Sequence, residues 1–364
     1  MPKSSGELKE FDLYFISDNE LVLLYPTENG IDFTMRHHIY DCFHDYDNWM
    51  DLMDINYVSD VNKIIAEGNI KDLIKKNDIK VDSDLHDIAK DICEKKKRIV
   101  LIAGPSSSGK TTTSKKLSLY LSSMGLNSVP ISLDDFFVNR DETPLDENGK
   151  RDYECLNALD VKLFNEVLNK LLNGETVQMP RYNFLEGQKE FSEDHTLTIT
   201  DSDCLVIEGL HGLNPELLKL VDLDVVYKIY ISPLTPLNVD RHNYVSTTDN
   251  RLLRRMIRDF RTRGRSAEAT LATWASVRRG EEKYIFPYTD TCDAILNTAY
   301  AYEIGMLKVY VEPLLYSIPM DSQFYFEARR LIDNLKTFYT VPSEYVPDDN
   351  LLREFIGGSI FEEE

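Results

Sequence analysis

The sequence has few cysteines, little basic charge and no long apolar run. Of its 364 residues, 41 are Lys or Arg and 62 are Asp or Glu, so the net charge is −21. A chain this acidic repels polyanions, which argues against general binding of nucleic acid or of an anionic membrane surface. The five cysteines stand far apart without a C-x-x-C pair, so we expect reduced thiols. The polar N-terminus and the absence of about eighteen consecutive apolar residues predict neither a signal peptide nor a membrane span, and we expect a cytoplasmic protein.

Length and composition predict one main α/β domain with appendages, because 364 residues with 42% hydrophobic content suffice for two cores. Apolar runs predict strands at 98–103, 127–133, 203–208, 224–232 and 293–298. Amphipathic patterns predict helices around 84–97, 110–124, 160–173, 214–221 and 235–262. This alternation is typical of a parallel sheet with helices on both faces. The segment 176–200 interrupts it and predicts an inserted antiparallel hairpin.

Shifts in composition divide the chain into three expected parts. We predict an N-terminal α+β accessory region over 1–95, the α/β domain over 96–300, and a helical C-terminal extension over 301–364 that packs on that domain. The N-terminal region is either a cap on the core or a surface for dimerisation or docking. The sequence therefore leaves open whether the chain forms a homo-oligomer.

The most specific motif lies between the strand at 98–103 and the helix at 110–124. It fits the pattern G-x-x-x-x-G-K-S/T of a phosphate-binding loop (P-loop) at every fixed position. In such a loop, backbone N–H groups surround the phosphates, Lys110 bridges the β- and γ-phosphates, and the Thr111 hydroxyl binds Mg²⁺. A chance match within a serine-rich linker is the alternative, which the flanking strand and helix disfavour. We therefore predict a site for ATP or GTP, formed by Gly104, Ser106, Ser107, Ser108, Gly109, Lys110, Thr111 and Thr112.

Acidic residues end two of the predicted strands, at the sheet edge where parallel α/β folds bind ligands. Phosphoryl transfer requires a metal, cations on the transferring oxygens and a carboxylate that orients the attacking hydroxyl. Asp134 and Asp135 follow the strand at 127–133, and one of them is a candidate general base, although Asp at such a position also caps turns and helices. Glu208 ends the strand at 203–208 and is a candidate ligand of Mg²⁺ or of its bound water.

A dense run of arginines stands out in this acidic chain. Within fifteen residues the run contains Arg251, Arg254, Arg255, Arg258, Arg261, Arg263 and Arg265. The first four share one face of the predicted helix. Because guanidinium groups suit phosphate oxygens, we interpret the run as a lid over the triphosphate, with Gly264 as its hinge or helix end. A salt-bridged surface helix is the alternative, but only one acid lies within the run to neutralise it.

Two further features indicate an acceptor pocket. Tyr182 and Phe184 lie on the same side of the predicted hairpin strand, at a spacing that would flank a flat ring. Packing of these rings onto the sheet is the alternative. The segment Arg151-Asp152-Tyr153-Glu154 offers a carboxylate that could accept hydrogen bonds from a vicinal diol, although this signal is weak in isolation.

Taken together, these motifs resemble those of the uridine kinase and phosphoribulokinase family of P-loop kinases, over about residues 98–300. The resemblance implies that Asp134, rather than Asp135, is the base, and that Glu208 with Thr111 holds the metal. It aligns Tyr153 and Glu154 with the family's ribose-binding segment. In the lid, it implies that Arg258 and Arg263 bind donor phosphates while Arg255 and Arg265 face the acceptor.

The sequence departs from this family at positions that, in the family, recognise the acceptor. Glu154 replaces the usual aspartate, and the His-Pro that follows it in the family is absent. Gly187 stands where uridine-cytidine kinases carry a base-reading histidine, and Thr273 stands at the position of a glutamine after the lid. Since such groups discriminate between bases, these departures bear on pyrimidine specificity and not on phosphoryl transfer.

The segments ISLDDFFVNR, IEGLHGLN and SVRRGEEKYIFP are most similar to a bacterial branch of uridine kinase-like proteins. Members of that branch carry a threonyl-tRNA-synthetase-like N-terminal region. Residues 1–95 would be a remnant of that region, and no activity on tRNA is implied.

Three hypotheses for the function follow. The first is phosphorylation of the 5′-hydroxyl of a nucleoside, with uridine and cytidine as acceptors in pyrimidine salvage, Asp134 as base, and Lys110 with the lid arginines on the transferring phosphoryl group. The second replaces the nucleoside by a sugar phosphate or another small alcohol, for which Arg181, Arg278 and Arg279 are additional candidate cations. The third is a nucleotide-binding regulator without turnover. In each case the partner is a small molecule, and the sequence predicts neither nucleic acid nor membrane as a partner.

Overall fold

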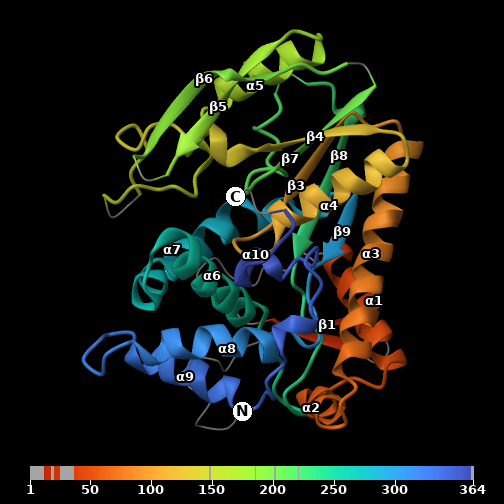
Figure 1. Ribbon diagram of the computed structural model, residues 1–364, viewed down its shortest axis with the longest axis vertical. Coiled ribbons are helices and arrows are strands. Elements are labelled where there is room, and N and C mark those ends of the chain that lie inside the picture. Colours follow the sequence, from red (N-terminus) through yellow and green to blue (C-terminus); the bar gives the residue numbers. More distant parts are fainter. Residues whose placement is uncertain are drawn as a thin grey trace. The chain divides into compact units, whose positions relative to one another are not determined.

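The computed structural model describes residues 12–17, 20–24, 37–146, 149–184, 186–200, 202–219 and 221–361. The chain forms two compact units, Met1–His37 and His38–Glu364. In the first unit, strands β1 (Asp12–Ser17) and β2 (Glu20–Leu24) pair in antiparallel orientation. The second unit carries all the motifs of the predicted nucleotide site (Figure 1).

A five-stranded sheet forms the centre of the second unit. Its strands are β3 (Ile99–Ala103), β4 (Asn127–Ser132), β7 (Asp203–Glu208), β8 (Val226–Ser232) and β9 (Ala294–Asn297). Their order is β4-β7-β3-β8-β9, and every pairing is parallel. The five predicted strands and the parallel sheet are thereby confirmed, and β3, which leads into the loop motif, is the central strand.

Each face of the sheet has its own apolar core, because successive side chains of a strand point to opposite faces. Val100 and Ile102 of β3 belong to the larger core, with α3 (Ile70–Glu94), α4 (Lys110–Ser123), α6 (Thr247–Arg263) and α8 (Glu303–Tyr316). Ile99 and Leu101 belong to the other core, with α5 (Val161–Leu172). Helices therefore cover both faces, as the sequence predicts.

The remaining α-helices of the second unit extend the larger core. They are α1 (His37–Leu52), α2 (Val58–Ala66), α7 (Ala267–Tyr284), α9 (Tyr325–Leu335) and α10 (Arg353–Ile356), and each contributes buried side chains to it. The helix predicted at 84–97 is the end of α3, which begins earlier, at Ile70. The second unit thus contains residues 38–95 of the predicted N-terminal region and the described part of 301–364 together with the sheet. Within the described ranges, no helix has the length and apolar character needed to cross a membrane.

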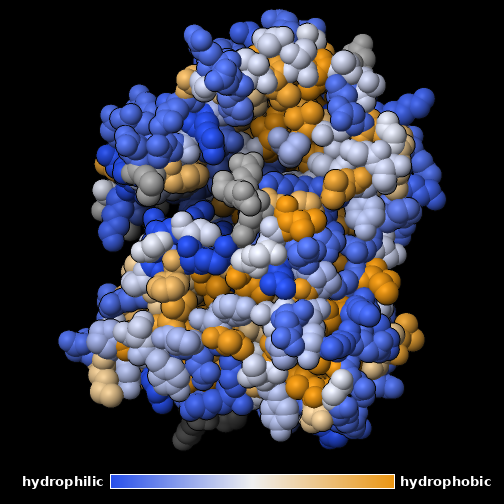
Figure 2. Space-filling model, viewed as in Figure 1, coloured by the Kyte–Doolittle hydropathy of each residue, from blue (hydrophilic) through white to orange (hydrophobic). Residues whose placement is uncertain are grey.

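The inserted hairpin is present as β5 (Val177–Asn183) and β6 (Gln188–Leu197), which pair in antiparallel orientation. The register shifts between Gln178 and Pro180, which fits a proline that cannot donate a hydrogen bond to the partner strand. Figure 1 shows the hairpin with α5 on the β4 side of the sheet. On the face drawn in Figure 2, hydrophilic residues predominate, in keeping with the acidic composition.

One predicted helix is wrong and another begins later than predicted, and in both places side chains take over backbone hydrogen bonds. Residues 215–219, within the helix predicted at 214–221, form turns, in which the Asn214 side chain accepts the N–H of Glu216 and the Asn165 side chain donates to the carbonyl of Leu217. The helix predicted from 235 starts only at Thr247, after the N-cap Ser246. Before it, the Asp240 carboxylate accepts the N–H groups of two residues that follow it, which favours turns over a helix.

Candidate active site

Three neighbouring strands bring the predicted donor groups to one edge of the sheet. The loop follows β3, Asp134 follows β4 in a short 3₁₀ turn (Leu133–Phe136), and Glu208 is the last residue of β7. In the register of the sheet, Glu208 lies beside both Ile102 of β3 and Ser132 of β4. The site therefore sits at the carboxyl ends of β3, β7 and β4, where this type of sheet binds ligands.

The loop has the backbone that phosphate binding requires. Gly109 precedes α4 with φ 92°, a left-handed conformation that favours glycine, and a Cβ there would overlap the side chain of Leu351. The first N–H groups of α4 are consequently directed toward the loop, where they can meet an anion. The Lys110 ammonium donates to the loop carbonyls of Gly104 (3.1 Å) and Pro105 (3.3 Å).

A cavity of about 460 Å³ lies over this loop and joins most of the predicted donor residues. It contains the general-base candidate Asp134, the metal candidates Thr111 and Glu208, and three arginines of the predicted lid. Its lining comprises Ser107, Gly109, Lys110, Thr111, Thr112, Lys115, Asp134, Glu208, Arg258, Arg261, Thr262, Arg263, Glu354, Ser359 and Phe361. The loop residues Gly104, Ser106 and Ser108 lie outside this lining. Cations and carboxylates thus face each other across a space of the size of a small ligand.

The two adjacent aspartates after β4 have different surroundings. The Asp135 carboxylate accepts the backbone N–H of Tyr182 (3.3 Å), and burial raises the pKa of this group. Asp134 instead lines the cavity next to the loop. Of the two carboxylates, Asp134 is therefore the one that can meet a substrate hydroxyl near the transferring phosphoryl group.

Thr111 and Glu208 lie close enough to share a cation. The Thr111 hydroxyl is 3.5 Å from Glu208 Oε1, and the Ser132 hydroxyl donates to the same oxygen at 2.9 Å. Burial and the charge of Asp134 raise the pKa of Glu208, which a bound cation would counteract. Among the described residues, no three His, Cys, Asp or Glu side chains are arranged to hold a metal. One hydroxyl and one carboxylate fit Mg²⁺, which keeps waters and takes its other ligands from the phosphates of a nucleotide.

The carboxylate of Asp259 contacts three arginines of the site. Its buried carboxylate lies 3.1 Å from Arg258, 3.3 Å from Arg255 and 3.5 Å from Arg263. Burial alone would raise the pKa of Asp259, but these arginines outweigh it and lower the pKa. The charge of Arg258 lowers the pKa of Arg263 to about 10, so Arg263 stays cationic at neutral pH.

Two arginines of the predicted lid face away from the cavity, which corrects the interpretation of one common phosphate-binding face. Arg251 forms a buried ion pair with Glu281, and Arg254 forms one with Glu303 (2.6 Å). Arg254 also donates to the carbonyl of Thr298. The sequence suggests that a single acid is available, but these two glutamates lie outside the arginine run. Gly264, with φ 60°, ends α6 as predicted.

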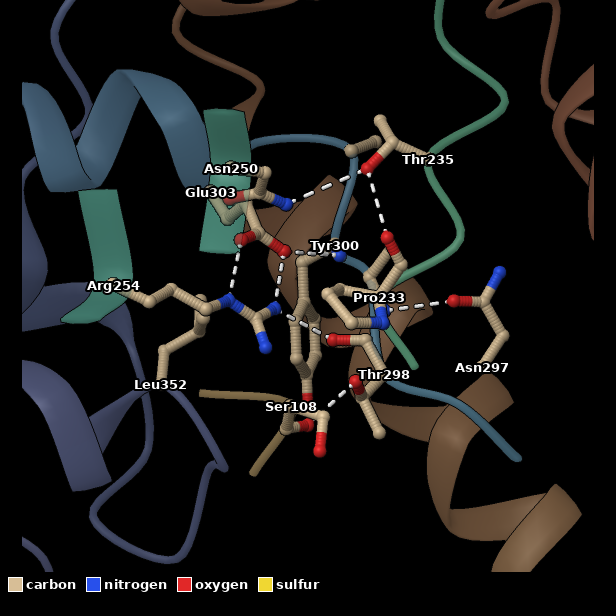
Figure 3. Close-up of polar contacts among 12 residues, drawn as sticks. Ser108, Pro233, Thr235, Asn250, Arg254, Asn297, Thr298, Tyr300, Glu303 and Leu352 are labelled. Carbon is tan, nitrogen blue, oxygen red and sulfur yellow. Dashed lines mark hydrogen bonds and ion pairs between the residues drawn. The ribbon is translucent and has the colours of Figure 1, made fainter. Parts of the chain in front are cut away.

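The pair of Arg254 and Glu303 lies beside Thr298, which connects the first half of α6 to Ser108 of the loop (Figure 3). Next to Arg254, the Thr298 hydroxyl donates to the carbonyl of Ser108 at 2.8 Å. Glu281 accepts the N–H of Ser106 at 3.1 Å. Arg255 donates to the Ser106 hydroxyl at 2.7 Å. The start of α6 is therefore tied to the loop through these contacts.

The acceptor candidate Glu154 lies partly buried against α7. It packs so closely on Gly280 that a Cβ there would overlap it. Burial raises the pKa of Glu154 to about 7, against the opposing charge of Arg255. Burial lowers the pKa of the nearby His211 to about 4, against the effect of the backbone at Cys155 and Glu154, so this ring is neutral at neutral pH.

Of the aromatic pair, Tyr182 lies in β5, whereas Phe184 follows the strand in a turn, and the two rings touch each other. The rings of Tyr182 and Phe184 are 5.1 Å apart in an edge-to-face arrangement, and Phe137 packs 5.6 Å from Tyr182. This spacing leaves no room for a flat ring between them. The exposed ring of Phe184, with the Arg263 guanidinium at 5.9 Å, is the surface that remains available.

The other acceptor candidates lie at the periphery. Tyr153 and Arg265 are exposed. Gly187 has no space for a side chain, because a Cβ would overlap the Arg140 guanidinium. Arg140 also donates to the carbonyl of Phe184, which places a cation beside the hairpin.

Sequence reasoning missed four residues of this site: Glu281, Glu303, His211 and Glu354. His211 follows the strand-end Glu208-Gly209 closely, which is a signal that could have drawn attention to it. Glu281 falls in a run of charged residues after the arginine helix. Glu303 and Glu354 have no local signal, because only the tertiary fold brings them to α6 and to the loop.

The parallel sheet, the loop after its central strand, and the carboxylates on the two adjacent strands define a P-loop phosphotransferase fold. A family-level comparison is more specific, since residues 99–304 match the Phosphoribulokinase / Uridine kinase family. The chain belongs to this family. Its members are phosphotransferases that act on hydroxyl groups, and the protein is an enzyme of this class with a uridine kinase-like domain.

Two relatives named uridine kinase agree with this assignment. The chain is 30% identical over 203 residues to a uridine kinase of Macrococcus caseolyticus, covering 55% of this chain and 88% of that protein. It is 27% identical to a uridine kinase of Halobacterium salinarum, covering 54% of this chain and 77% of that protein. Among solved structures, the phosphoribulokinase of Rhodobacter spheroides is 18% identical, with a TM-score of 0.35 and coverage of 57% of this chain and 78% of that one.

Proposed function

We propose that the protein transfers the γ-phosphoryl group of ATP, or of GTP, to the 5′-hydroxyl of a nucleoside, with uridine and cytidine as the first acceptors. The observation that carries the proposal is that one cavity holds both Lys110 of the loop and the carboxylate of Asp134. The relatives named uridine kinase support the choice of acceptor. Cytoplasmic location and homo-oligomer formation stay predictions from the sequence.

In this proposal the loop binds the donor and Asp134 prepares the acceptor. Backbone N–H groups from Gly104 to Thr112 surround the phosphates, while Lys110 leaves the loop carbonyls to bind the β- and γ-oxygens. Bound Mg²⁺, held through Thr111 and Glu208, would neutralise charge on the same oxygens. Asp134 accepts the hydroxyl proton, and Arg258 with Arg263 stabilises the charge on the transferring group.

The acceptor would lie across the cavity, between the loop and the hairpin. Glu154 would accept hydrogen bonds from the two ribose hydroxyls, and Arg255 would orient Glu154. A flat base would stack on the outer face of Phe184, since its inner side already contacts Tyr182. Tyr153 and Arg265 would close the exposed side.

A sugar phosphate is the second candidate acceptor. The guanidinium of Arg140 lies beside Gly187, where it could meet an anionic group of the acceptor. Among the cations considered from the sequence, Arg278 pairs with Glu281 (2.9 Å) and is already engaged, whereas Arg181 is exposed on the hairpin. Arg140 is therefore a further candidate for this role, beside Arg181.

The pair Asp134→Asn and Asp135→Asn tests the assignment of the base. We expect Asp134→Asn to lower kcat by about 10²-fold to 10⁴-fold with unchanged nucleotide affinity, because only proton transfer is lost. Asp135→Asn should keep most of the turnover. A near-normal rate in Asp134→Asn would refute the role of this residue.

A panel of acceptors tests the reaction itself. Nucleosides, sugar phosphates and small alcohols are incubated with labelled ATP and Mg²⁺, and the labelled product is separated. Product with uridine or cytidine alone supports the first proposal, and product with a sugar phosphate alone favours the second. Tight ATP binding without product for any acceptor would instead indicate a regulator.

A further inference from the structure

One wall of the donor cavity comes from a segment beyond the residues that match the family. The match ends at residue 304, whereas Glu354, Ser359 and Phe361 also line the cavity. Glu354 belongs to the short helix α10. The family assignment therefore says nothing about the role of this wall.

Glu354 already uses the hydrogen-bond donors that the loop offers to an anion. Its Oε2 accepts the backbone N–H of Thr112 at 3.1 Å and the Thr112 hydroxyl at 3.0 Å. Thr112 lies in the first turn of α4, whose N–H groups are the ones that a P-loop directs at phosphate. A phosphate oxygen needs the same donors and carries the same sign of charge. Carboxylate and phosphate cannot occupy this position together.

The backbone that carries Glu354 is held on several sides. Arg261 of α6 donates to the carbonyls of Glu354 (2.9 Å) and Phe355 (3.1 Å). Phe355 is fully buried, and Leu351 packs against Gly109 of the loop. Lys115 of α4 donates to the carbonyl of Phe361 at 2.7 Å. Because the backbone is anchored, the Glu354 side chain is the part that can leave the loop.

The charges of the cavity also oppose the presence of Glu354 and a phosphate at the loop at the same time. Glu354 contributes to the raised pKa of Glu208, so the two carboxylates repel each other across the loop. A triphosphate would add several negative charges at this place, and the low dielectric of the cavity strengthens the repulsion. Lys110 and Lys115 can then pair with the donor instead of with backbone carbonyl oxygens.

We propose that Glu354 is an intramolecular competitor of the donor nucleotide. Its carboxylate occupies the anion position at Thr112 and must rotate away before the donor phosphates bind, so that Glu354 sets the donor affinity. The inference rests on the proposed donor site. The measured Kd equals the intrinsic Kd divided by the fraction of molecules in which Glu354 is disengaged.

Nucleotide titrations of three variants of the full chain test this proposal. Binding of ATP with Mg²⁺ is measured by calorimetry for wild type, Glu354→Ala, Glu354→Asp and Glu354→Gln. We expect Glu354→Ala and Glu354→Asp to bind about tenfold more tightly, since neither side chain reaches Thr112 from the anchored backbone. Glu354→Gln should lie between them and wild type, because its amide oxygen still accepts the N–H bond but carries no charge. Glu344→Ala, an exposed glutamate outside the cavity, should bind like wild type.

The outcomes separate this inference from the proposed function. If wild type binds ATP and Glu354→Ala binds it equally well or more weakly, Glu354 does not compete with the nucleotide. The proposed donor site would not be affected by this result. If Glu354→Asp binds ATP like wild type and only the two uncharged variants bind more tightly, Glu354 does not compete by occupying the anion position at Thr112. Its negative charge would then weaken ATP binding through repulsion alone. If wild type and all variants fail to bind nucleotide, the donor site and this inference both fall. Thermal unfolding checks each fold, and Glu354→Asp, which keeps the charge and most of the volume, serves if Glu354→Ala does not fold.

Discussion

In the first half of α6, the side chains of Arg251 and Arg254 are at most 2% exposed and pair with Glu281 and Glu303. In the second half, the side chains of Arg258 and Arg263 are 17% and 40% exposed and face the donor cavity. The same residue type at the same helical spacing thus has two tasks. The arginines of the first half differ from those of the second because a glutamate distant in sequence forms an ion pair with each of them. The first half fixes the helix to the loop, and the second half presents cations to a ligand.

The largest effect should come from the cavity-facing half. Arg263→Ala removes a cation from the transferring phosphoryl group, and we expect kcat to fall by about 10³-fold or more with little change in Tm. Steady-state kinetics and thermal unfolding measure the two quantities. Arg330→Ala is the control, since Arg330 pairs with Asp249 at the start of α6, far from the loop in sequence and exposed to solvent. A large fall in Tm for Arg263→Ala would contradict the assignment of stability to the first half of α6 and of ligand binding to the second.

The anchoring half should respond in stability. Arg254→Met leaves Glu303 buried without its partner, and we expect the free energy of unfolding to fall by about 3–5 kcal/mol in urea denaturation. Replacement of both partners, in Arg254→Met with Glu303→Leu, should recover at least half of this loss because no charge remains buried. If the single variant unfolds like wild type, the buried pair does not anchor α6.

These two halves also mark the limit of what the sequence can predict. The strands, the loop, the hairpin and the strand-end carboxylates follow from local patterns, and the structure has them where the patterns predict. The partner of Arg254 lies 49 residues away, and that of Thr112 lies 242 residues away. No periodicity encodes such pairs, so the four arginines on one helical face suggest one common task. For the same reason, a turn at Asn214 cannot be told from a helix before Asn165 is known to reach the Leu217 carbonyl.

Asp259 joins the two halves, and its removal should have an intermediate effect. In Asp259→Asn the carboxylate no longer gathers Arg255, Arg258 and Arg263, so we expect kcat/KM for ATP to fall by about 30-fold to 100-fold. Kinetics at several ATP concentrations separate kcat from KM. Because Asp259 is only one of several groups that place these arginines, a loss as large as that of Arg263→Ala would mean that Asp259 has a more direct role.

The smallest effect concerns Arg255, at the boundary between the halves, and its neighbour Glu154. Since burial raises the pKa of Glu154 to about 7, this carboxyl is protonated below that pH and charged above it. We expect kcat/KM for the acceptor to rise about tenfold from about pH 6 to about pH 8. Glu154→Gln should flatten the profile, and Arg255→Ala should move its midpoint to higher pH, because a charge that stabilises the carboxylate is lost. A profile that is unchanged in Glu154→Gln would assign the titration to another group.

The hydrogen bond from Thr298 to the Ser108 carbonyl joins two residues that are 190 positions apart. While the ribosome makes the chain, Ser108 emerges long before Thr298 and the pair of Arg254 with Glu303. A nascent chain therefore displays the complete loop sequence without the groups that hold its shape. We expect the nascent chain to bind nucleotide only after β9 and α8 have left the ribosome. Cellular ATP would then not assist the folding of the earlier part of the chain.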